Sequence, residues 1–201
     1  MIPVFRFPII ITALVLVLIK PLVAQDYNAG IAANKRGDYI TALKHLRPLA
    51  EEGFAEAQAL FGAMYAEGRG LPQDFTEAIK WFRKGVAQGN HWAQHNLGYM
   101  YAEGRGVPQN YIEAAKWFRK SANQGNADAQ NNLGAMYETG MGVLQDRILA
   151  YVWYQIAVAN GDKSAFSYNR DISEKTLTSA ELIKAQAIAR KCWNKPVTCP
   201  P

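Results

Sequence analysis

The strongest constraint on the fold is an internal repeat of 36 residues. Shifting the 201-residue chain by 36 positions aligns three consecutive blocks without a gap, at residues 53–88, 89–124 and 125–160. The segment YAEGRGLPQDFTEAIKWFRK of the first block returns as YAEGRGVPQNYIEAAKWFRK in the second. Self-similarity at such a period is typical of solenoids, in which each repeat packs against its neighbours. We therefore expect a stack of similar structural units over these residues.

Each block begins with a predicted helix that has one apolar stripe. In the first block Ala57, Phe61 and Tyr65 lie at i, i+4 and i+8, which places them on the same helix face. Gly62 lies beside this stripe, and we expect it to let a neighbouring backbone come close. The same columns hold alanine, leucine, tyrosine and glycine in the other blocks: Ala93, Leu97, Tyr101 and Gly98, then Ala129, Leu133, Tyr137 and Gly134.

A glycine-containing turn leads to the second predicted helix. Gly68 and Gly70 can supply the positive φ that ends the first helix, and Pro72 stops its continuation. Asp74 and Glu77 have the spacing of a capping box, in which the short side chain accepts from a backbone N–H and the glutamate reaches back. The second block repeats the pair as Asn110 and Glu113.

A glycine-rich turn before a helix can also bind phosphate. Such a loop is expected once, after a strand, in a nucleotide-binding unit. Here the turn occurs in three copies between predicted helices, and the sequence carries no strand signal. We therefore interpret the turn as a helix connection.

The aligned columns form the pattern A-x-x-x-L-G-x-x-Y-x-x-G-x-G-V-P-Q-[DN]-x-x-x-A-x-x-W-[FY]-x-x-A. This pattern resembles Sel1-like repeats, which are relatives of the tetratricopeptide repeat, and it covers residues 53–160. The resemblance implies an all-α fold, an α/α superhelix of helix-turn-helix repeats, whose members mostly act as adaptors. It does not identify a partner.

The segments that flank the repeats are expected to cap the solenoid. Residues 25–52 resemble a tetratricopeptide unit, and residues 161–201 would form capping helices and a tail, with a helix from about 179 to 193. A basic face in the first two blocks becomes apolar in the third, since Lys80, Arg83 and Lys84 correspond to Val152, Gln155 and Ile156. Because a terminal repeat must hide the surface that a missing neighbour would cover, we expect the carboxyl-terminal helices to pack there.

Residues 1–24 have the layout of a secretory signal peptide. Arg6 precedes an apolar run from Phe7 to Ile19, and the small residue Ala24 provides a cleavage point. The run has 13 residues, whereas a helix that spans a membrane needs about 20. We expect cleavage and a periplasmic or secreted protein without membrane insertion; the alternative is an uncleaved anchor in the inner membrane.

The net charge and the number of cysteines restrict the possible partners and the bonds that the chain can form. Cleavage would remove Arg6 and Lys20 and no acid, so the formal net charge would fall from +5 to +3. That balance does not indicate nucleic-acid binding, which usually requires a concentrated basic stripe. Cys192 and Cys199 are the two cysteines, and an exported chain with two cysteines is expected to form one disulfide.

The candidate binding surface follows from the resemblance to tetratricopeptide repeats, whose first helices line a concave face. Trp92, His95 and Tyr99 share one helix face at i, i+3 and i+7 and would form a shelf with a pocket on each side. The alternative is that these aromatic side chains pack between repeats. The other predicted lining positions are Glu56, Ala59, Ala63 and Glu67; Glu103; Asp128, Asn131, Ala135, Glu138 and Thr139; and, from the cap, Tyr27, Ile31, Asn34 and Lys35.

Catalytic, cofactor-binding and metal-binding residues are not predicted. His91 and His95 are spaced for zinc at i and i+4, but a third ligand is not apparent nearby, and we interpret both as surface histidines.

We expect a monomeric scaffold that binds a protein or peptide partner. An enzyme acting on cell-wall material or β-lactams is an alternative, although no serine after residue 24 begins an S-x-x-K motif. A purely structural role in envelope assembly is another.

Overall fold

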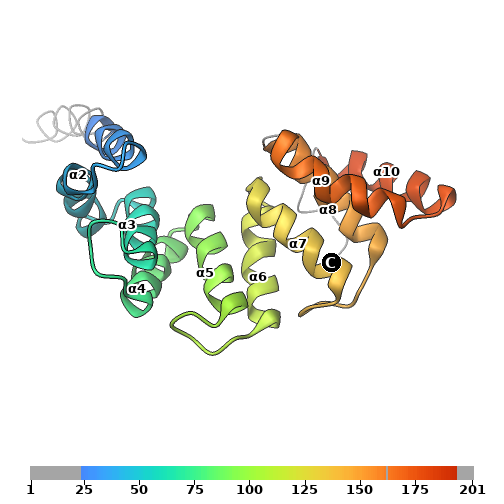
Figure 1. The fold of residues 1–201 in the computed structure, drawn as a ribbon, viewed down its shortest axis with the longest axis horizontal. Helices are drawn as coiled ribbons and strands as arrows, with labels where there is room; N and C mark the ends of the chain where they lie inside the picture. Colours follow the sequence, from blue (N-terminus) through green and yellow to red (C-terminus); the bar gives the residue numbers. More distant parts are fainter. Residues whose placement is uncertain (1–23, 162, 194–201) are drawn as a thin grey trace, which may run out of the picture.

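The computed structural model describes residues 24–161 and 163–193, which form an all-α solenoid without strands in these ranges (Figure 1). Residues 24–35 are helical. The following helices are α2 (Tyr39–Glu51), α3 (Ala55–Glu67), α4 (Phe75–Ala87), α5 (His91–Glu103), α6 (Tyr111–Ala122), α7 (Ala127–Thr139), α8 (Arg147–Asn160), α9 (Lys163–Lys175) and α10 (Ser179–Trp193). The predicted helix pairs of the three blocks are α3/α4, α5/α6 and α7/α8. The all-α repeat fold is therefore confirmed.

Some predictions concern residues that the structure does not describe. Residues 1–23 of the expected signal peptide lie outside the described ranges, as does Cys199. Cys192 is buried near the end of α10, and its pairing with Cys199 stays a prediction. Among the described residues, no helix has both the length and the hydrophobicity needed to cross a membrane.

Glycines end the first helix of each repeat as predicted. Gly68, Gly104 and Gly140 follow α3, α5 and α7 with φ values of 69°, 67° and 77°, in the left-handed region. The backbone N–H of each of these glycines donates to a methionine carbonyl in the last turn of the helix. The acceptors are the carbonyls of Met64, Met100 and Met136. Because a residue with a Cβ rarely adopts this conformation, the turn fixes where each first helix stops.

The start of each second helix is only partly as predicted. The Asp74 carboxylate accepts from the backbone N–H groups of Thr76 and Glu77, at 2.8 and 3.0 Å, as expected. The N–H of Asp74, however, donates to the Tyr65 carbonyl at 3.0 Å, and Glu77 forms an ion pair of 2.5 Å with Lys80. The reciprocal half of the predicted capping box is thus wrong, because the turn folds back onto the first helix and occupies that N–H.

The two helices of each repeat meet where the first helix has glycine and the second has an aromatic ring. A Cβ added at Gly98 would lie 2.9 Å from the Phe118 ring, and one added at Gly134 would lie 2.7 Å from the Tyr154 ring. The first repeat has the same contact between Gly62 and Phe82, at 2.7 Å. A neighbouring backbone also comes close, as predicted: the Ala78 carbonyl oxygen would lie 3.1 Å from a Cβ at Gly62, and the Ala114 carbonyl oxygen 3.3 Å from a Cβ at Gly98. The aromatic side chain approaches more closely still.

Buried glutamines connect the ends of the helices. Gln130 is fully buried in α7; its amide nitrogen donates to the Ala122 carbonyl of the preceding repeat at 2.9 Å, and its oxygen accepts from Asn160 at 3.1 Å. Gln58 occupies the same column and bonds the Ala50 carbonyl and the Gln88 amide. Since a buried amide without partners is costly, these contacts hold consecutive repeats in one register.

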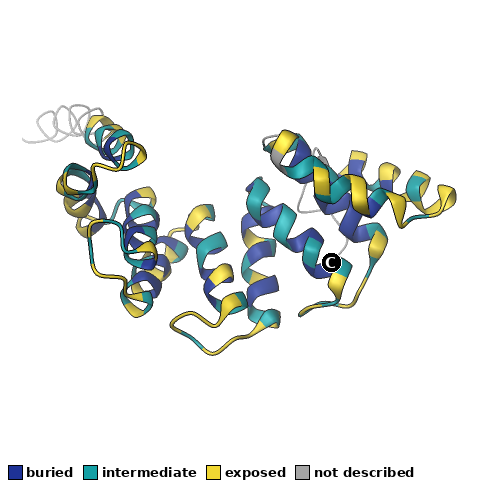
Figure 2. Cartoon of the chain, in the orientation of Figure 1, coloured by how far each residue is buried: buried dark blue, intermediate teal, exposed yellow. Residues whose placement is uncertain are grey.

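The carboxyl-terminal helices do not continue the pattern of the repeats. In the three repeats the second helix packs mainly against its own first helix, whereas α9 and α10 both pack against α8. Val152 and Ile156 of α8 are buried in a cluster that also contains Ala185 and Ala189 of α10. Figure 2 shows α8 as a mostly buried helix next to the more exposed α9 and α10. The apolar substitutions in the third repeat are thus covered.

We predict that replacing Gly98 with alanine destabilises the protein. The added Cβ overlaps the Phe118 ring, and overpacking of this kind costs about 1–3 kcal/mol. Thermal unfolding measures the loss. In a double-mutant cycle with Phe118→Leu, which makes room for the methyl group, the combined loss should be smaller than the sum; strictly additive losses would disprove the contact.

The position of α10 on α8 can be tested with two substitutions on one helix. Ala185 is fully buried against α8, whereas Ala187 is exposed. Ala185→Glu places a carboxylate in an apolar contact and should cost on the order of 3 kcal/mol or more. Ala187→Glu makes the same chemical change in solvent and should leave the melting temperature nearly unchanged. Equal melting temperatures for the two variants would contradict this packing.

Candidate functional site

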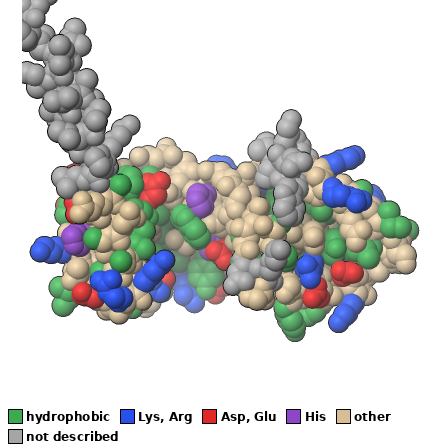
Figure 3. Space-filling model, turned by 90° about the horizontal axis from the view of Figure 1, so that it is seen from above, with side chains coloured by type: hydrophobic (Ala, Val, Ile, Leu, Met, Phe, Trp, Pro, Cys, Tyr) green, Lys and Arg blue, Asp and Glu red, His purple; other side chains and the backbone are tan. Residues whose placement is uncertain are grey.

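The inner side of the curved stack has a row of pockets between consecutive first helices. The stack curves around a hollow that faces upward in Figure 1, and Figure 3 looks onto this side from above. Hydrophobic side chains lie on this side in several places along the molecule, with acidic and histidine side chains among them (Figure 3). Pockets in this row lie between residues 24–35 and α5, between α3 and α5, and between α5 and α7.

The first of these, which we call the cap pocket, has a volume of about 330 Å³. It brings together predicted residues from the amino-terminal cap and the first two repeats, including Glu56 of α3 and Trp92 of α5. Glu56 is exposed, and its charge contributes to the raised pKa of Tyr27, of which burial is the larger cause. The other lining residues are Ile31, Asn34, Lys35, Ala59, Leu60, Ala63, Glu67, Arg69 and Asn96.

Tyr99 separates the other two pockets. It lines the pocket between α3 and α5, which we call the central pocket and which has a volume of about 320 Å³. It also lines the pocket between α5 and α7, which we call the α5–α7 pocket and which has a volume of about 210 Å³. Tyr99 is 37% exposed and Trp92 is 48% exposed, so both remain accessible after the repeats have packed. The Arg105 guanidinium lies 5.4 Å from the Tyr99 ring centre, within the range of a cation–π contact. The two aromatic residues therefore mark separate positions along the groove.

His95 lies mostly between repeats. Its ring is 5.6 Å from the Phe118 ring, and its Nε2 is 3.2 Å from the side-chain nitrogen of Asn132 in the next repeat. Burial lowers the pKa of His95, and the charge of Asp128 opposes this shift. His95 still lines the central pocket. His95 thus joins two repeats and contributes only part of its surface to the groove.

His91 is also a contact between repeats. Its Nδ1 lies 3.2 Å from the Asn126 side-chain nitrogen, and its backbone carbonyl accepts from the Ser121 hydroxyl at 2.7 Å. Burial lowers the pKa of His91, with the Glu56 charge acting in the opposite direction. His91 and His95 are therefore half-buried histidines that also make contacts between repeats. The described residues contain no group of three or more His, Cys, Asp or Glu side chains suited to a metal ion.

The remaining predicted residues are divided between the pockets and the end of the groove. Glu103 is exposed and lines the α5–α7 pocket. Asn131 accepts from the Asn169 side chain of α9 at 2.9 Å, so that helix partly covers it. Asp128 is half-buried next to His95. Trp92, Tyr99, Glu56 and Glu103 consequently form the accessible part of the predicted site.

Several lining residues were not predicted from the sequence. Asn96 lines both the cap and central pockets, and Met141 lines the α5–α7 pocket. Met141 stands in the Gly-x-Gly turn of the third repeat, where the first two repeats have Arg69 and Arg105. That change from arginine to methionine was a visible signal in the aligned repeats.

Comparison with known proteins agrees with this architecture. The Sel1 repeat family model matches residues 55–90, 93–126 and 127–162. A Sel1 repeat protein from Oxalobacter formigenes has a similar crystal structure, with 34% identity over 69% of this chain and a TM-score of 0.62. A protective antigen present in uropathogenic Escherichia coli strains, described as displaying an SLR fold, has 34% identity over 86% of this chain and a TM-score of 0.76.

This chain spans 57% of the first of those proteins and 38% of the second. The search of curated proteins found no match. The three matched repeats cover more than half of the sequence, and they coincide with the helix pairs that build the groove. The chain therefore belongs to the Sel1 repeat family.

Proposed function

We propose that this protein is an exported scaffold that binds a protein or peptide partner in its concave groove. Proteins of the Sel1 repeat family generally act as scaffolds for protein interactions. Export rests on the signal-peptide layout of residues 1–24. The groove rests on the row of pockets described above.

The exposure of Trp92 and Tyr99 carries the proposal. In the other two repeats the columns of Trp92 and Tyr99 hold Glu56 and Ala63, then Asp128 and Ala135. The same helix packing is therefore achieved without aromatic residues at these columns. Half-exposed rings that packing does not require are available to a partner, and aromatic residues often provide much of the binding energy of an interface.

The charges of the groove indicate the type of partner. Glu56 and Glu103 are exposed beside the aromatic residues, and the Glu103 carboxylate is 4.0 Å from its nearest cation, Arg105. These carboxylates favour a segment with basic or amide side chains. An extended peptide or a helix lying along the groove could contact several pockets at once. A basic, partly apolar segment is thus the best match.

We predict that Trp92→Ala with Tyr99→Ala weakens partner binding by about 1 kcal/mol or more, which is a rise in Kd of about fivefold. The partner is first captured from envelope extract with the wild-type protein, and Kd is then measured by titration calorimetry. The fold should be retained, because both side chains are partly exposed.

Ile112→Ala is the matched control for this experiment. Ile112 is 59% exposed on α6 and lines none of the three pockets. Its removal should leave both Kd and the melting temperature unchanged. Normal binding by the double variant, or unfolding of that variant, would place the binding site elsewhere.

A further inference from the structure

We propose that the α5–α7 pocket is a subsite for one large apolar side chain of the partner, with a basic residue next to it. This inference rests on the proposed function, because it assigns chemistry to one part of the same groove. The pocket differs from its neighbours in a way that the repeat makes visible. Its walls come from α5, α6 and α7 and from the turn after α7.

An ion pair in the first two repeats is replaced by uncharged residues in the third. Glu67 pairs with Arg69 at 2.5 Å, and Glu103 with Arg105 at 4.0 Å. The corresponding residues of the third repeat are Thr139 and Met141. Both members of the pair have changed, and the change makes the surface beside the pocket less polar.

Met141 is not required there for folding. It is 47% exposed, and the same turn is built in the other repeats with arginine. The Thr139 hydroxyl donates to the Ala135 carbonyl at 2.8 Å and so is used within its own helix. An exposed methionine at a pocket is suited to binding, because its flexible thioether adapts to apolar groups of different shape.

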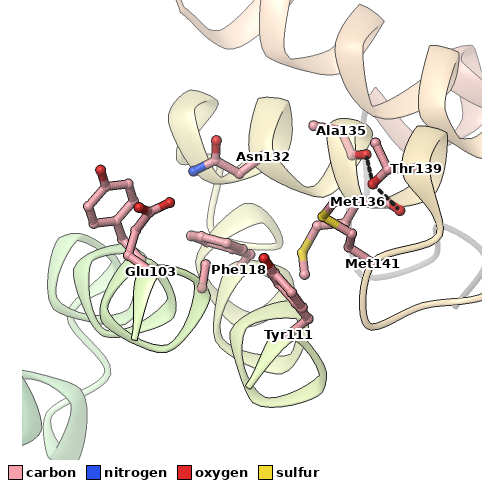
Figure 4. A pocket seen from close by; sticks show the side chains of 10 residues that line it. Glu103, Tyr111, Phe118, Asn132, Ala135, Met136, Thr139 and Met141 are labelled. Atoms are coloured by element: carbon pink, nitrogen blue, oxygen red, sulfur yellow. Dashed lines mark hydrogen bonds between the residues drawn. The ribbon is translucent and has the colours of Figure 1, made fainter. Parts of the chain in front are cut away.

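The walls of the α5–α7 pocket are mostly apolar. In Figure 4 the side chains of Phe118, Tyr111, Met136 and Met141 lie next to one another, with Asn132 across from Phe118 and Glu103 on the side away from Met141. A volume of about 210 Å³ is suited to one large aliphatic or aromatic side chain. The pocket thus offers apolar walls to that side chain and places a carboxylate at its edge.

Charge complementarity defines the neighbouring residue of the ligand. Among the residues that line this pocket, Glu103 is the only Asp, Glu, Lys or Arg. The Arg105 guanidinium lies at the 4.0 Å limit of an ion pair with it and also near the Tyr99 ring. A lysine or arginine beside the apolar side chain can therefore approach Glu103 without displacing a close partner.

The test uses three short peptides and the methyl groups of the methionines. The probes are acetyl-Gly-Lys-Leu-Lys-Gly-amide, the same peptide with alanine in place of leucine, and the same peptide with glutamate in place of both lysines. The protein carries ¹³C-methyl methionine, and methyl shifts are followed by NMR. Met64 is fully buried and serves as the internal control.

We expect the leucine–lysine peptide to shift the Met141 and Met136 methyl signals in a saturable manner, with Met64 unaffected. The alanine and glutamate peptides should bind at least about fivefold more weakly, because one lacks the apolar side chain and the other is repelled by Glu103. Equal shifts from all three peptides would overturn the proposal. So would a main shift at Met100, which lines the central pocket.

A substitution that copies the other repeats provides the second test. Thr139→Glu with Met141→Arg restores the charged pair and should abolish the shift that the leucine–lysine peptide causes at Met136. Met141→Leu is the matched control, because it keeps the wall apolar and should retain binding. Both variants should melt within a few degrees of the wild type, since position 141 is half exposed. Unchanged peptide binding by the charged variant would overturn the subsite.

These results are separable from the test of the proposed function. The peptide titration needs no natural partner and reads the pocket directly. If Trp92→Ala with Tyr99→Ala loses partner binding while the peptides leave Met141 unshifted, the groove binds the partner and the subsite is wrong. If that double variant retains partner binding while the leucine–lysine peptide still shifts Met141, the subsite stands and the proposed role of the aromatic shelf is wrong.

Discussion

The contact between a glycine and an aromatic ring within each helix pair is the constraint on which the solenoid depends. Gly98 leaves space for the Phe118 ring, and a Cβ at that position would lie 2.9 Å from it. The other two repeats use the same pair of columns. At the corresponding position of α9 the chain has Arg170, and α10 packs against α8. The glycine of the three repeats is thus missing from α9, the first helix after them.

Because these contacts and the buried glutamines fix the repeats, the inner face can vary without loss of the fold. Trp92 and Tyr99 stand in columns where the other repeats have acidic or small residues. Met141 stands in a column of arginines. Each of these residues is partly exposed and lies at a pocket. Variation at accessible positions on a conformationally fixed backbone is how repeat proteins acquire specific binding surfaces.

The groove changes in character along its length. The cap pocket contains the exposed carboxylate of Glu56 next to Trp92, whereas the α5–α7 pocket has methionine and aromatic walls with Glu103 at one side. His95 lies between these regions and joins the second repeat to the third. A partner that follows the groove would thus meet a region with both acidic and basic side chains first and a more apolar region further on.

The sequence alone determined the repeat length, the helix pairs, the turns at Gly68, Gly104 and Gly140, and the shared helix face of Trp92 and Tyr99. These features depend on local propensity and on spacing within one helix, which a 36-residue alignment displays directly. The tertiary structure decided that His95 bonds Asn132, that α9 reaches Asn131, and that Met141 completes a pocket. Such contacts join residues from different helices, and their distances depend on how consecutive repeats pack in space rather than on the pattern within any one of them.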